Sequence, residues 1–586
     1  MKNLTALIAW ALLGFCAYSQ NEPFTKTVLN TGYNLEHPFE IFTTIQDDSL
    51  WVNTRSGRIY KINRINGGRR EILNITTSVL FTRNYTGPSV TGIAQDGMFG
   101  MALHPDAFKG LGKDSLYVAY CYNAGGGVRR TRIAKYWYNS ATRMLTNGTT
   151  LMQGLPGSDD HNGGRMAMGP DLKLYYSCGD QGANQFGNAC IEIKAQKDIS
   201  AAELAAQNYT NYAGHILRMN LDGSVPSDNP VFAGVISHVF SKGHRNPQGL
   251  VFEKNSSGNT FPGAKLFSSE QGAVIDDEVN IIEPGKNYGW PHISGYNDDV
   301  WYTYKNWSLS PNGSGASNCS NYSSECGTAT NMQGGSPANP PRTESSWNAA
   351  DYTDPIVSQF PQTTSDCFGN NWLARPTVAW SSIEYYTTTT GIPGWSNSLL
   401  LTTLKRSAII RYKLNNTNNG VTDLAGNAYD TIQYFRDNAA LNRFRDLAIS
   451  ANGVTLYVIT DSVGATSGPS NGTASITDRG KVIAYTYTGS TLSLRDPILA
   501  TRNKNEQVHI YPNPAQGYFV VNTKDLGYRT LQLKIYNVQG RLVHRQTVSH
   551  SLEQVNVTHL PAGQYMVQVV NRNELTLSTQ KIQVTR

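Results

Sequence analysis

The sequence predicts an all-β protein, a six-bladed β-propeller followed by a small C-terminal β-sandwich. A pattern of paired strands recurs about six times before residue 495, and few segments have the apolar spacing of a long amphipathic helix. The chain is rich in Gly (54) and Tyr (32), and only 16% of its residues are charged. This profile is typical of loop-rich extracellular β proteins and argues against disorder. An array of unrelated β-sandwiches is the alternative to the propeller.

Each copy of the repeat joins an apolar strand of the type Leu-Tyr-Val to a second strand of the type Gly-x-Ile-x-Lys/Arg. Radial repetition of such units protects sheet edges, so we expect one propeller over residues 20–495, with a long insertion at 308–341. The copies are Leu50-Trp51-Val52 with Gly57-Arg58-Ile59, Leu116-Tyr117-Val118 with Arg132-Ile133-Ala134-Lys135, Leu174-Tyr175-Tyr176 with Gly214-His215-Ile216, Lys265-Leu266-Phe267 with Val279-Asn280-Ile281, Leu399-Leu400-Leu401 with Ala408-Ile409-Ile410-Arg411, and Leu456-Tyr457-Val458 with Gly480-Lys481-Val482.

The first 19 residues read as a signal peptide. A basic start, Met1-Lys2, precedes an apolar run over residues 4–17, and Ala17-Tyr18-Ser19 fits a cleavage site. A transmembrane anchor needs about 20 apolar residues, which exceeds this run. A lipoprotein attached at Cys16 is the other alternative, and the bulky Phe15 argues against it.

Six cysteines remain after cleavage, an even number that permits disulfides in an oxidising compartment. Cys319 and Cys326 are the easiest pair, and a Cys178–Cys190 bridge would stiffen the loop between them. No Cys-x-x-Cys or Cys/His spacing typical of zinc is present.

A linker over residues 496–507 separates the body from a β-rich module over residues 508–586. Expected strands at 531–536, 554–557 and 564–570 are divided by turns. Ten Lys/Arg and four Asp/Glu fall after residue 500, so the remaining 39 of each sign balance in the body. The net charge of +6 therefore falls within the last 86 residues, most of it in this module, and nothing in the body indicates a nucleic-acid partner.

Four segments of the body concentrate polar residues suited to catalysis. A His oriented by a carboxylate acts as a general base near neutral pH, and paired Arg with a Lys suit a ligand with several carboxylates. Acidic runs at 275–278 and 296–299 offer the oxygen ligands that calcium prefers. Taken singly, a His is more often structural and an Arg pair is usually solvated, whereas the acidic runs are as often plain surface charge; it is their joint presence in propeller loops that favours a site. The segments are Ser158-Asp159-Asp160-His161-Asn162-Gly163-Gly164-Arg165, Gly179-Asp180-Gln181-Gly182-Ala183-Asn184-Gln185, Gly243-His244-Arg245-Asn246-Pro247-Gln248-Gly249 and Asn442-Arg443-Phe444-Arg445-Asp446.

From about residue 25 to 490, the ordered motifs resemble the soluble quinoprotein glucose dehydrogenases of the glucose/sorbosone dehydrogenase family. Members of this family carry pyrroloquinoline quinone (PQQ) on a six-bladed propeller. Besides the first three segments above, the matching strings are Gly169-Pro170-Asp171, Ser269-Glu270-Gln271-Gly272, Asn287-Tyr288-Gly289-Trp290-Pro291 and Leu404-Lys405-Arg406.

The resemblance implies oxidation of an aldose at its anomeric C1 hydroxyl to a lactone, with hydride transfer to PQQ. His161 would be the general base, Asp180 would orient it, and Arg245 would stabilise negative charge on the quinone. A calcium ion held by PQQ and the carbonyls of Gly272 and Ala273 would act as a Lewis acid. The implied PQQ-binding residues are Arg245, Asn246, Gln248, Lys405, Arg443 and Arg445.

The resemblance also implies a sugar site and a structural calcium pair. The sugar would contact Gln95, Asp160 and Gln185. The calcium ligands would be Glu278, the carbonyls of Tyr288 and Ser294, Asp298 and Glu344.

The sequence departs from the family in the substrate wall. Trp372 and Arg375 stand where close relatives have Tyr and Trp, so the mouth should be more polar. Ala273 replaces a Pro, and the cysteine partner of Cys367 is replaced by Ala374. Catalysis is therefore a firmer expectation than a preference for glucose.

The C-terminal module contains three ordered motifs: Tyr511-Pro512-Asn513-Pro514, Ile535-Tyr536-Asn537-Val538-Gln539-Gly540 and Leu560-Pro561-Ala562-Gly563-Gln564-Tyr565. Together they resemble the sorting domain of type IX secretion, with a generic carbohydrate-binding or adhesive β-sandwich as the alternative. We therefore expect export through the periplasm of a Gram-negative bacterium to the surface or medium, with the secretion machinery, a sugar and an external electron acceptor as partners. A homodimer is expected by analogy with relatives.

For the body, two other functions remain as alternatives to a sugar dehydrogenase: a calcium-dependent propeller lactonase and a catalytically silent binding propeller.

Overall fold

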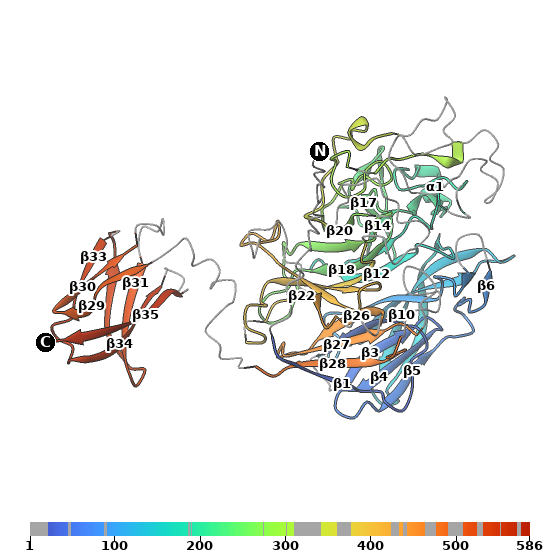
Figure 1. Cartoon of the computed structure of the whole chain (residues 1–586). Helices are drawn as coiled ribbons and strands as arrows, with labels where there is room; N and C mark the ends of the chain where they lie inside the picture. Colours follow the sequence, from blue (N-terminus) through green and yellow to red (C-terminus); the bar gives the residue numbers. More distant parts are fainter. Residues whose placement is uncertain are drawn as a thin grey trace, which may run out of the picture. The chain divides into compact units, whose positions relative to one another are not determined.

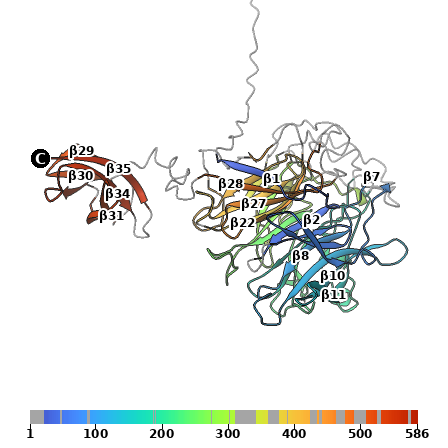
Figure 2. The same cartoon turned by 90° about the horizontal axis from the view of Figure 1, so that it is seen from below.

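The chain forms two compact units, Met1–Leu492 and Ser493–Arg586 (Figures 1 and 2). The computed structural model describes residues 22–44, 49–86, 91–185, 188, 190–273, 275–300, 302–309, 342–359, 377–388, 390–422, 433–436, 442–462, 476–489, 508–523, 531–550, 552–570 and 576–586. The signal peptide, the linker and the Cys319–Cys326 pair lie outside these residues and remain predictions. Within the described ranges, no helix is long and apolar enough to cross a membrane.

Six antiparallel sheets of four strands make up the described part of the first unit, so the prediction of an all-β chain is confirmed. Most of their strands are largely or fully buried, as sheets covered on both faces require. In sheet order the strands are β2 (Pro38–Thr43), β3 (Ser49–Thr54), β4 (Arg58–Asn63), β5 (Arg69–Asn74); β8 (Met98–Leu103), β9 (Ser115–Asn123), β10 (Arg129–Asn139), β11 (Met144–Pro156); β12 (Gly163–Met168), β13 (Leu174–Cys178), β14 (His215–Met219), β17 (Val239–Lys242); β18 (Pro247–Phe252), β19 (Leu266–Glu270), β20 (Asp277–Ile282), β21 (Val357–Gln359); β22 (Trp380–Tyr386), β23 (Ser398–Thr403), β24 (Ile409–Lys413), β25 (Gln433–Tyr434); and β26 (Phe444–Ile449), β27 (Thr455–Thr460), β28 (Val482–Tyr487), β1 (Phe24–Val28).

The first strands of successive sheets form a closed ring. Strands β2, β8, β12, β18, β22 and β26 each contact the next, and β26 contacts β2. Strand β1 from the start of the chain completes the last sheet by pairing with β28. This closure ties the two ends of the first unit together, as in a β-propeller.

A buried Arg165 links five of these inner strands at the centre of the ring. Its guanidinium lies 3.0 Å from Asp446 Oδ2 and 3.3 Å from Glu40 Oε1. It also donates to the carbonyls of Gln248 and Ser381, at 3.0 Å each. One cation thus satisfies two buried carboxylates and joins β12 to β2, β18, β22 and β26.

Short elements complete the described part of the first unit. They are the strand pairs β6 (Tyr85–Thr86) with β7 (Thr91–Gly92) and β15 (Val231–Phe232) with β16 (Val235–Ile236), helix α1 (Ala201–Ala205), and the 3₁₀ turns Thr210–Tyr212, Trp307–Leu309 and Glu344–Ser346. A Ser200–Glu203 capping box begins α1.

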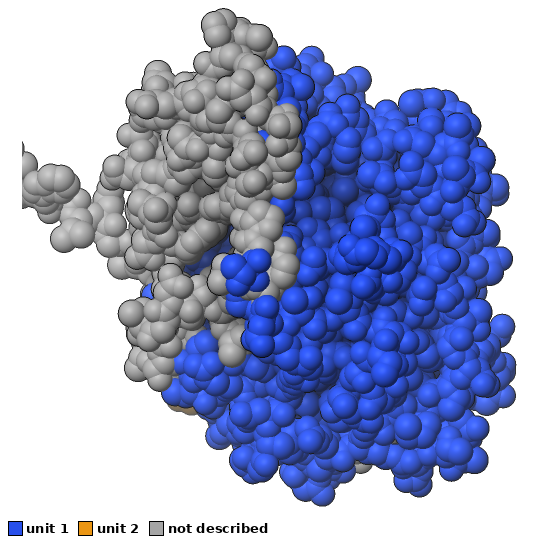
Figure 3. Space-filling view, turned by 90° about the vertical axis from the view of Figure 1, so that its right-hand side faces the viewer, with its two compact units in different colours: residues 1–492 blue, residues 493–586 orange. Residues whose placement is uncertain are grey.

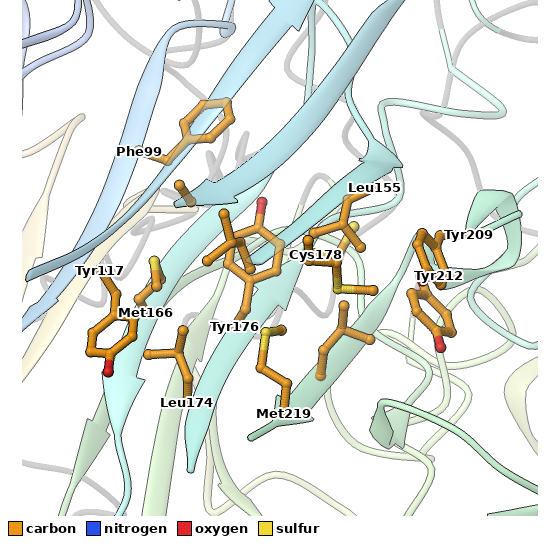
Figure 4. Packing of buried hydrophobic residues seen from close by; sticks show 14 of the residues in the cluster. Phe99, Tyr117, Leu155, Met166, Leu174, Tyr176, Cys178, Tyr209, Tyr212 and Met219 are labelled. Carbon is orange, nitrogen blue, oxygen red and sulfur yellow. The ribbon is translucent and has the colours of Figure 1, made fainter. Parts of the chain in front are cut away.

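An apolar cluster fills the space between the second and third sheets (Figure 4). Cys121 and Cys178 belong to this cluster and are buried free thiols. The predicted Cys178–Cys190 bridge is therefore wrong, because the β13 strand directs Cys178 into the core. Cys190 is disulfide-bonded, and its partner lies outside the described residues.

The second unit is a seven-stranded sheet around its own apolar core. All neighbours are antiparallel except β29 and β35, which are parallel. In sheet order the strands are β32 (Leu542–Val548), β31 (Leu531–Asn537), β34 (Gly563–Val570), β35 (Thr576–Thr585), β29 (His509–Gln516), β30 (Tyr518–Asn522) and β33 (Leu552–Asn556).

Candidate functional site

The predicted site residues gather at one rim of the ring because of strand direction. Adjacent strands are antiparallel, so the start of an inner strand and the end of its neighbour lie at the same edge. His161 and Arg245 lie two residues before β12 and β18, and Arg443 directly precedes β26. Asp180 and Lys405 lie two residues after β13 and β23, the neighbours of inner strands.

His161 and Asp180 form a buried pair. His161 Nδ1 lies 2.9 Å from Asp180 Oδ1, which also accepts the Gly182 N–H at 2.9 Å. His161 has a φ of 42°, which a non-glycine residue adopts at some energetic cost. Gly179 allows this arrangement, because a Cβ there would lie 2.0 Å from the His161 carbonyl oxygen.

Gln185 determines which nitrogen of His161 carries the proton. Arg245 Nη2 donates to Gln185 Oε1 at 2.8 Å, and because Arg only donates, the Gln185 amide nitrogen must face the other way. That nitrogen lies 3.2 Å from His161 Nε2, which therefore accepts. The proton is on Nδ1, directed at Asp180, and Nε2 presents a lone pair suited to a general base.

The three residues predicted to contact a sugar are in mutual contact. Gln185 Nε2 donates to Asp160 Oδ2 at 3.1 Å, and Gln95 Nε2 donates to Asp160 Oδ1. Burial raises the pKa of Asp160, an effect that the neighbouring His161 opposes. The structure thus gathers a carboxyl and two amides beside the base, a set that suits a polyhydroxylated ligand.

Arg245 spans the site from the base to the Gln271-Gly272 backbone. Its Nη1 donates to the carbonyls of Gln271 at 3.2 Å and Gly272 at 2.9 Å. Its Nε is buried, and no described residue forms a hydrogen bond with it. A cationic donor therefore remains available next to the predicted base.

A pocket beside these residues contains the predicted Arg443, Arg445 and Gln248, together with Gln95. Arg445 Nη2 donates to Asp461 Oδ2 at 2.5 Å, and Arg443 Nε lies 3.5 Å from the same oxygen. Burial alone would raise the pKa of Asp461, yet the charges of Arg445 and Arg443 hold it well below its usual range. Burial lowers the pKa of Arg443 to about 10.

Sequence reasoning missed several residues of this pocket, including Arg55, His37, Gln271 and Asp461. Arg55 donates to the Asp96 carbonyl at 2.6 Å and to the Ala94 carbonyl, so it holds both sides of Gln95. A search for every Arg at the end of an expected strand, such as Arg55 after Leu50-Trp51-Val52, could have found it.

Two other residues predicted to bind the cofactor, Asn246 and Lys405, form hydrogen bonds to neighbouring residues. Asn246 accepts the Gly163 N–H at 3.1 Å and donates to Gln271 Oε1 at 3.0 Å. Lys405 Nζ donates to Thr377 Oγ1 at 2.8 Å, and it is Leu404 that lines the pocket.

The predicted calcium ligands fall in two places. Ala273 lies beside Gly272, whose carbonyl accepts from Arg245. Glu278 and Glu344 accept the adjacent backbone N–H groups of Gly295, at 2.7 Å, and Ser294, at 2.9 Å.

Burial is the main reason that the pKa of Glu278 and that of Glu344 rise to about 8, with added repulsion from Asp298 on Glu344. The Tyr288 hydroxyl donates to the Ile281 carbonyl at 2.5 Å. Across the described ranges, no three His, Cys, Asp or Glu side chains are close enough to hold a metal ion by themselves.

Trp372 and Arg375 of the expected substrate wall lie outside the described residues, which form the blue surface of the first unit in Figure 3. The departure of this wall from the family therefore remains a prediction.

Comparison with known proteins gives matches to both parts of the chain. A family model described as glucose/sorbosone dehydrogenase matches residues 35–311, and one described as secretion system C-terminal sorting domain matches residues 509–585. The chain is 34% identical over 489 residues to quinoprotein glucose dehydrogenase B of Acinetobacter calcoaceticus, covering 80% of this chain and 92% of that one. It is 25% identical over 208 residues to the aldose sugar dehydrogenase YliI of Escherichia coli, covering 35% and 48%.

Among solved structures, the soluble aldose sugar dehydrogenase from Escherichia coli in its apo form superposes with a TM-score of 0.51 at 19% identity. The match covers 79% of this chain and all of that one. At this identity, the likeness indicates a shared fold.

Proposed function

Because the chain belongs to the glucose/sorbosone dehydrogenase family, we propose that it is a PQQ- and calcium-dependent aldose dehydrogenase that oxidises the anomeric C1 hydroxyl of a sugar to a lactone. Its sorting domain directs it to the cell surface or medium. The observation that carries the proposal is the Gln185 bridge, which places the Nε2 lone pair of His161 beside the cationic Arg245.

His161 takes the proton of the C1 hydroxyl at Nε2. Its Nδ1–H remains directed at Asp180 Oδ1, 2.9 Å away, so the carboxylate stabilises the imidazolium that forms. Asp160, Gln95 and Gln185 hold the other hydroxyls and orient C1. His161, Asp180, Asp160 and Gln185 are each at most 6% exposed, which limits competing water.

The residues present fit PQQ. Its three carboxylates would match a pocket with Arg443, Arg445 and Arg55. Arg445 Nε, like Arg245 Nε, is a buried donor with which no described residue forms a hydrogen bond. Asn246, Gln248 and Lys405 would complete the binding set. When bound, PQQ would supply a two-electron acceptor, and the Arg245 guanidinium would stabilise negative charge on it.

Calcium is part of the proposal because backbone carbonyls and several buried carboxylates lie close together, and a divalent cation would balance their negative charge. The carbonyls of Gly272 and Ala273 would hold one ion beside PQQ. The second site would use Glu278, Glu344, Asp298 and the carbonyls of Tyr288 and Ser294. Burial and the repulsion of Glu278 also raise the pKa of Asp276 to about 8, which supports a cation in this cluster.

We predict that calcium removal destabilises the first unit. Chelation by EDTA should lower Tm by several degrees, since buried carboxylates then repel each other without a cation. Calorimetry with and without chelator measures the effect, and restored Ca²⁺, but not Mg²⁺, should reverse it. A Tm that is independent of chelator would contradict the calcium sites.

We also propose the number of blades, the domain boundaries and the form of the C-terminal unit. The ring of inner strands supports six blades over residues 20–495, with a signal peptide at 1–19 and a linker at 496–507. Since one core collects residues from all seven strands of the second unit, we propose that its sheet curls into a sandwich over residues 508–586 and serves type IX secretion.

The test is reconstitution of the purified apo-protein with PQQ and Ca²⁺, followed by dye reduction in the presence of aldoses. Sugar-dependent dye reduction supports the proposal, and none with any aldose despite bound PQQ overturns it. His161→Ala should abolish turnover and leave PQQ binding unchanged. Lactone hydrolysis without PQQ would instead identify a lactonase.

A further inference from the structure

Trp290 contacts two of the three residues that the proposed reaction needs. Its indole Nε1–H donates to Asp180 Oδ2 at 3.0 Å, and its ring centroid lies 5.4 Å from the guanidinium carbon of Arg245. The side chain is 7% exposed and packs on Tyr302, with ring centroids 5.9 Å apart.

The hydrogen bonds of Asp180 are divided between its two oxygens. Oδ1 receives His161 Nδ1 and the Gly182 N–H, whereas Oδ2 receives Trp290 Nε1. Asp180 is 2% exposed, so water cannot readily replace a lost donor. The indole N–H therefore fixes the rotation of the carboxylate that aims Oδ1 at the base.

Trp290 is itself held firmly between two loops. Its backbone N–H donates to the Gly243 carbonyl at 3.1 Å, two residues before Arg245. Its carbonyl accepts from Gln196 Nε2 at 2.8 Å. The ring can therefore act as a fixed surface for the Arg245 guanidinium.

We propose that Trp290 is a positioning residue that couples the His161–Asp180 pair to Arg245, through its N–H on one side and its ring face on the other. This inference rests on the proposed function for its catalytic meaning, while the geometry that it describes can be measured without turnover.

The charged groups around the base are few. Asp180 faces His161 Nδ1, Asp160 Oδ1 lies 3.8 Å from Nε2, and Arg245 acts through Gln185. Trp290 is uncharged, so its replacement alters how Asp180 is held without adding or removing a charge.

The test replaces the N–H and the ring separately. Trp290→Phe and the isosteric β-(3-benzothienyl)alanine at 290 remove the donor and keep an aromatic face, and Trp290→Leu removes both. Trp137→Phe, on strand β10 away from the site, is the matched control. The readouts are the downfield NMR signal of the His161 Nδ1–H, assigned by its loss in His161→Gln, and the kinetic constants of the holoenzyme.

We expect Trp290→Phe and the benzothienyl variant, which lose the donor but keep an aromatic face, to shift or broaden the His161 Nδ1–H signal and to lower kcat about tenfold. Their sugar KM and PQQ affinity should stay within about twofold of wild type. Trp290→Leu should also raise sugar KM, as Arg245 loses its support, and Trp137→Phe should change nothing. An unchanged Nδ1–H signal in the benzothienyl protein overturns the inference. If wild type oxidises no sugar, the proposed function fails while the NMR signal still decides the role of Trp290.

Discussion

At the scale of single residues, the geometry of the base depends on a close backbone approach that only glycine allows. His161 lies in the left-handed region at a φ of 42°, and Gly179 approaches its carbonyl closely. The cost of holding His161 there is offset by its hydrogen bond to Asp180. Strain of this kind is typical of functional sites.

We predict that Gly179→Ala disrupts this loop. The added Cβ would lie 2.0 Å from the His161 carbonyl oxygen, so the loop must move, at a cost of about 1–3 kcal/mol in unfolding free energy and most of the activity. Thermal unfolding and dye reduction measure both effects. Gly32→Ala, where no atom lies within 4 Å of the added Cβ, is the control and should change stability by less than about 0.5 kcal/mol. Full activity in Gly179→Ala would show that the loop is more compliant than its geometry indicates.

At the scale of elements, inner strands supply both the site and its support. Their starts carry the polar residues at one rim, and Arg165 on β12 joins them at the centre. The pair with Asp446 is 3.0 Å long and nearly inaccessible to solvent. Removal of one partner from such a pair leaves a charge buried without compensation.

We predict that Arg165→Met destabilises the first unit by about 3–5 kcal/mol, because Glu40 and Asp446 lose their shared cation. Urea unfolding measures this loss. Arg58→Met is the matched control, since Arg58 and Glu71 form an ion pair that is about one-third exposed, and it should cost less than about 1 kcal/mol. Equal losses in the two variants would exclude a special role for the central cation.

At the scale of the whole molecule, stability should depend on pH through the same centre. Burial and the neighbouring Asp446 raise the pKa of Glu40 to about 8, against the effect of Arg165. A carboxyl whose pKa is raised on folding contributes most stability below its ordinary pKa, and this contribution is lost as the pH rises through about 8. The centre of the ring is therefore most stable with Glu40 protonated.

We predict that the unfolding free energy falls between pH 5 and pH 9 and that Glu40→Gln, which cannot ionise, flattens this fall. Urea unfolding at three pH values measures the slope. A slope that is identical in wild type and Glu40→Gln would show that other groups cause it.

We predict that the first unit oxidises sugar without the second unit, which is needed only for export. Each has its own apolar core, and the sorting domain contains none of the site residues. Deletion of residues 493–586 should leave kcat within about twofold and abolish appearance at the cell surface. Cell fractionation and dye reduction test both parts, and inactive truncated protein with bound PQQ would contradict this independence.

The sequence by itself determined the features that are local. Alternating strands, turn residues and dense motifs around His161, Asp180 and Arg245 predicted an all-β fold, the type of site and the sorting domain. These signals are readable because they depend on side chains within a few residues of each other.

Only the tertiary structure decided which distant side chains meet. Trp290 stood in a recognised motif, yet its bond to Asp180 spans 110 residues, and Arg165 and Asp446 are separated by 281. The sequence likewise did not predict that Arg55 and Asp461 line the pocket or that Cys178 is a buried free thiol. Such contacts arise from the way the sheets close into a ring, which brings together rims of strands that have no local relation in the chain.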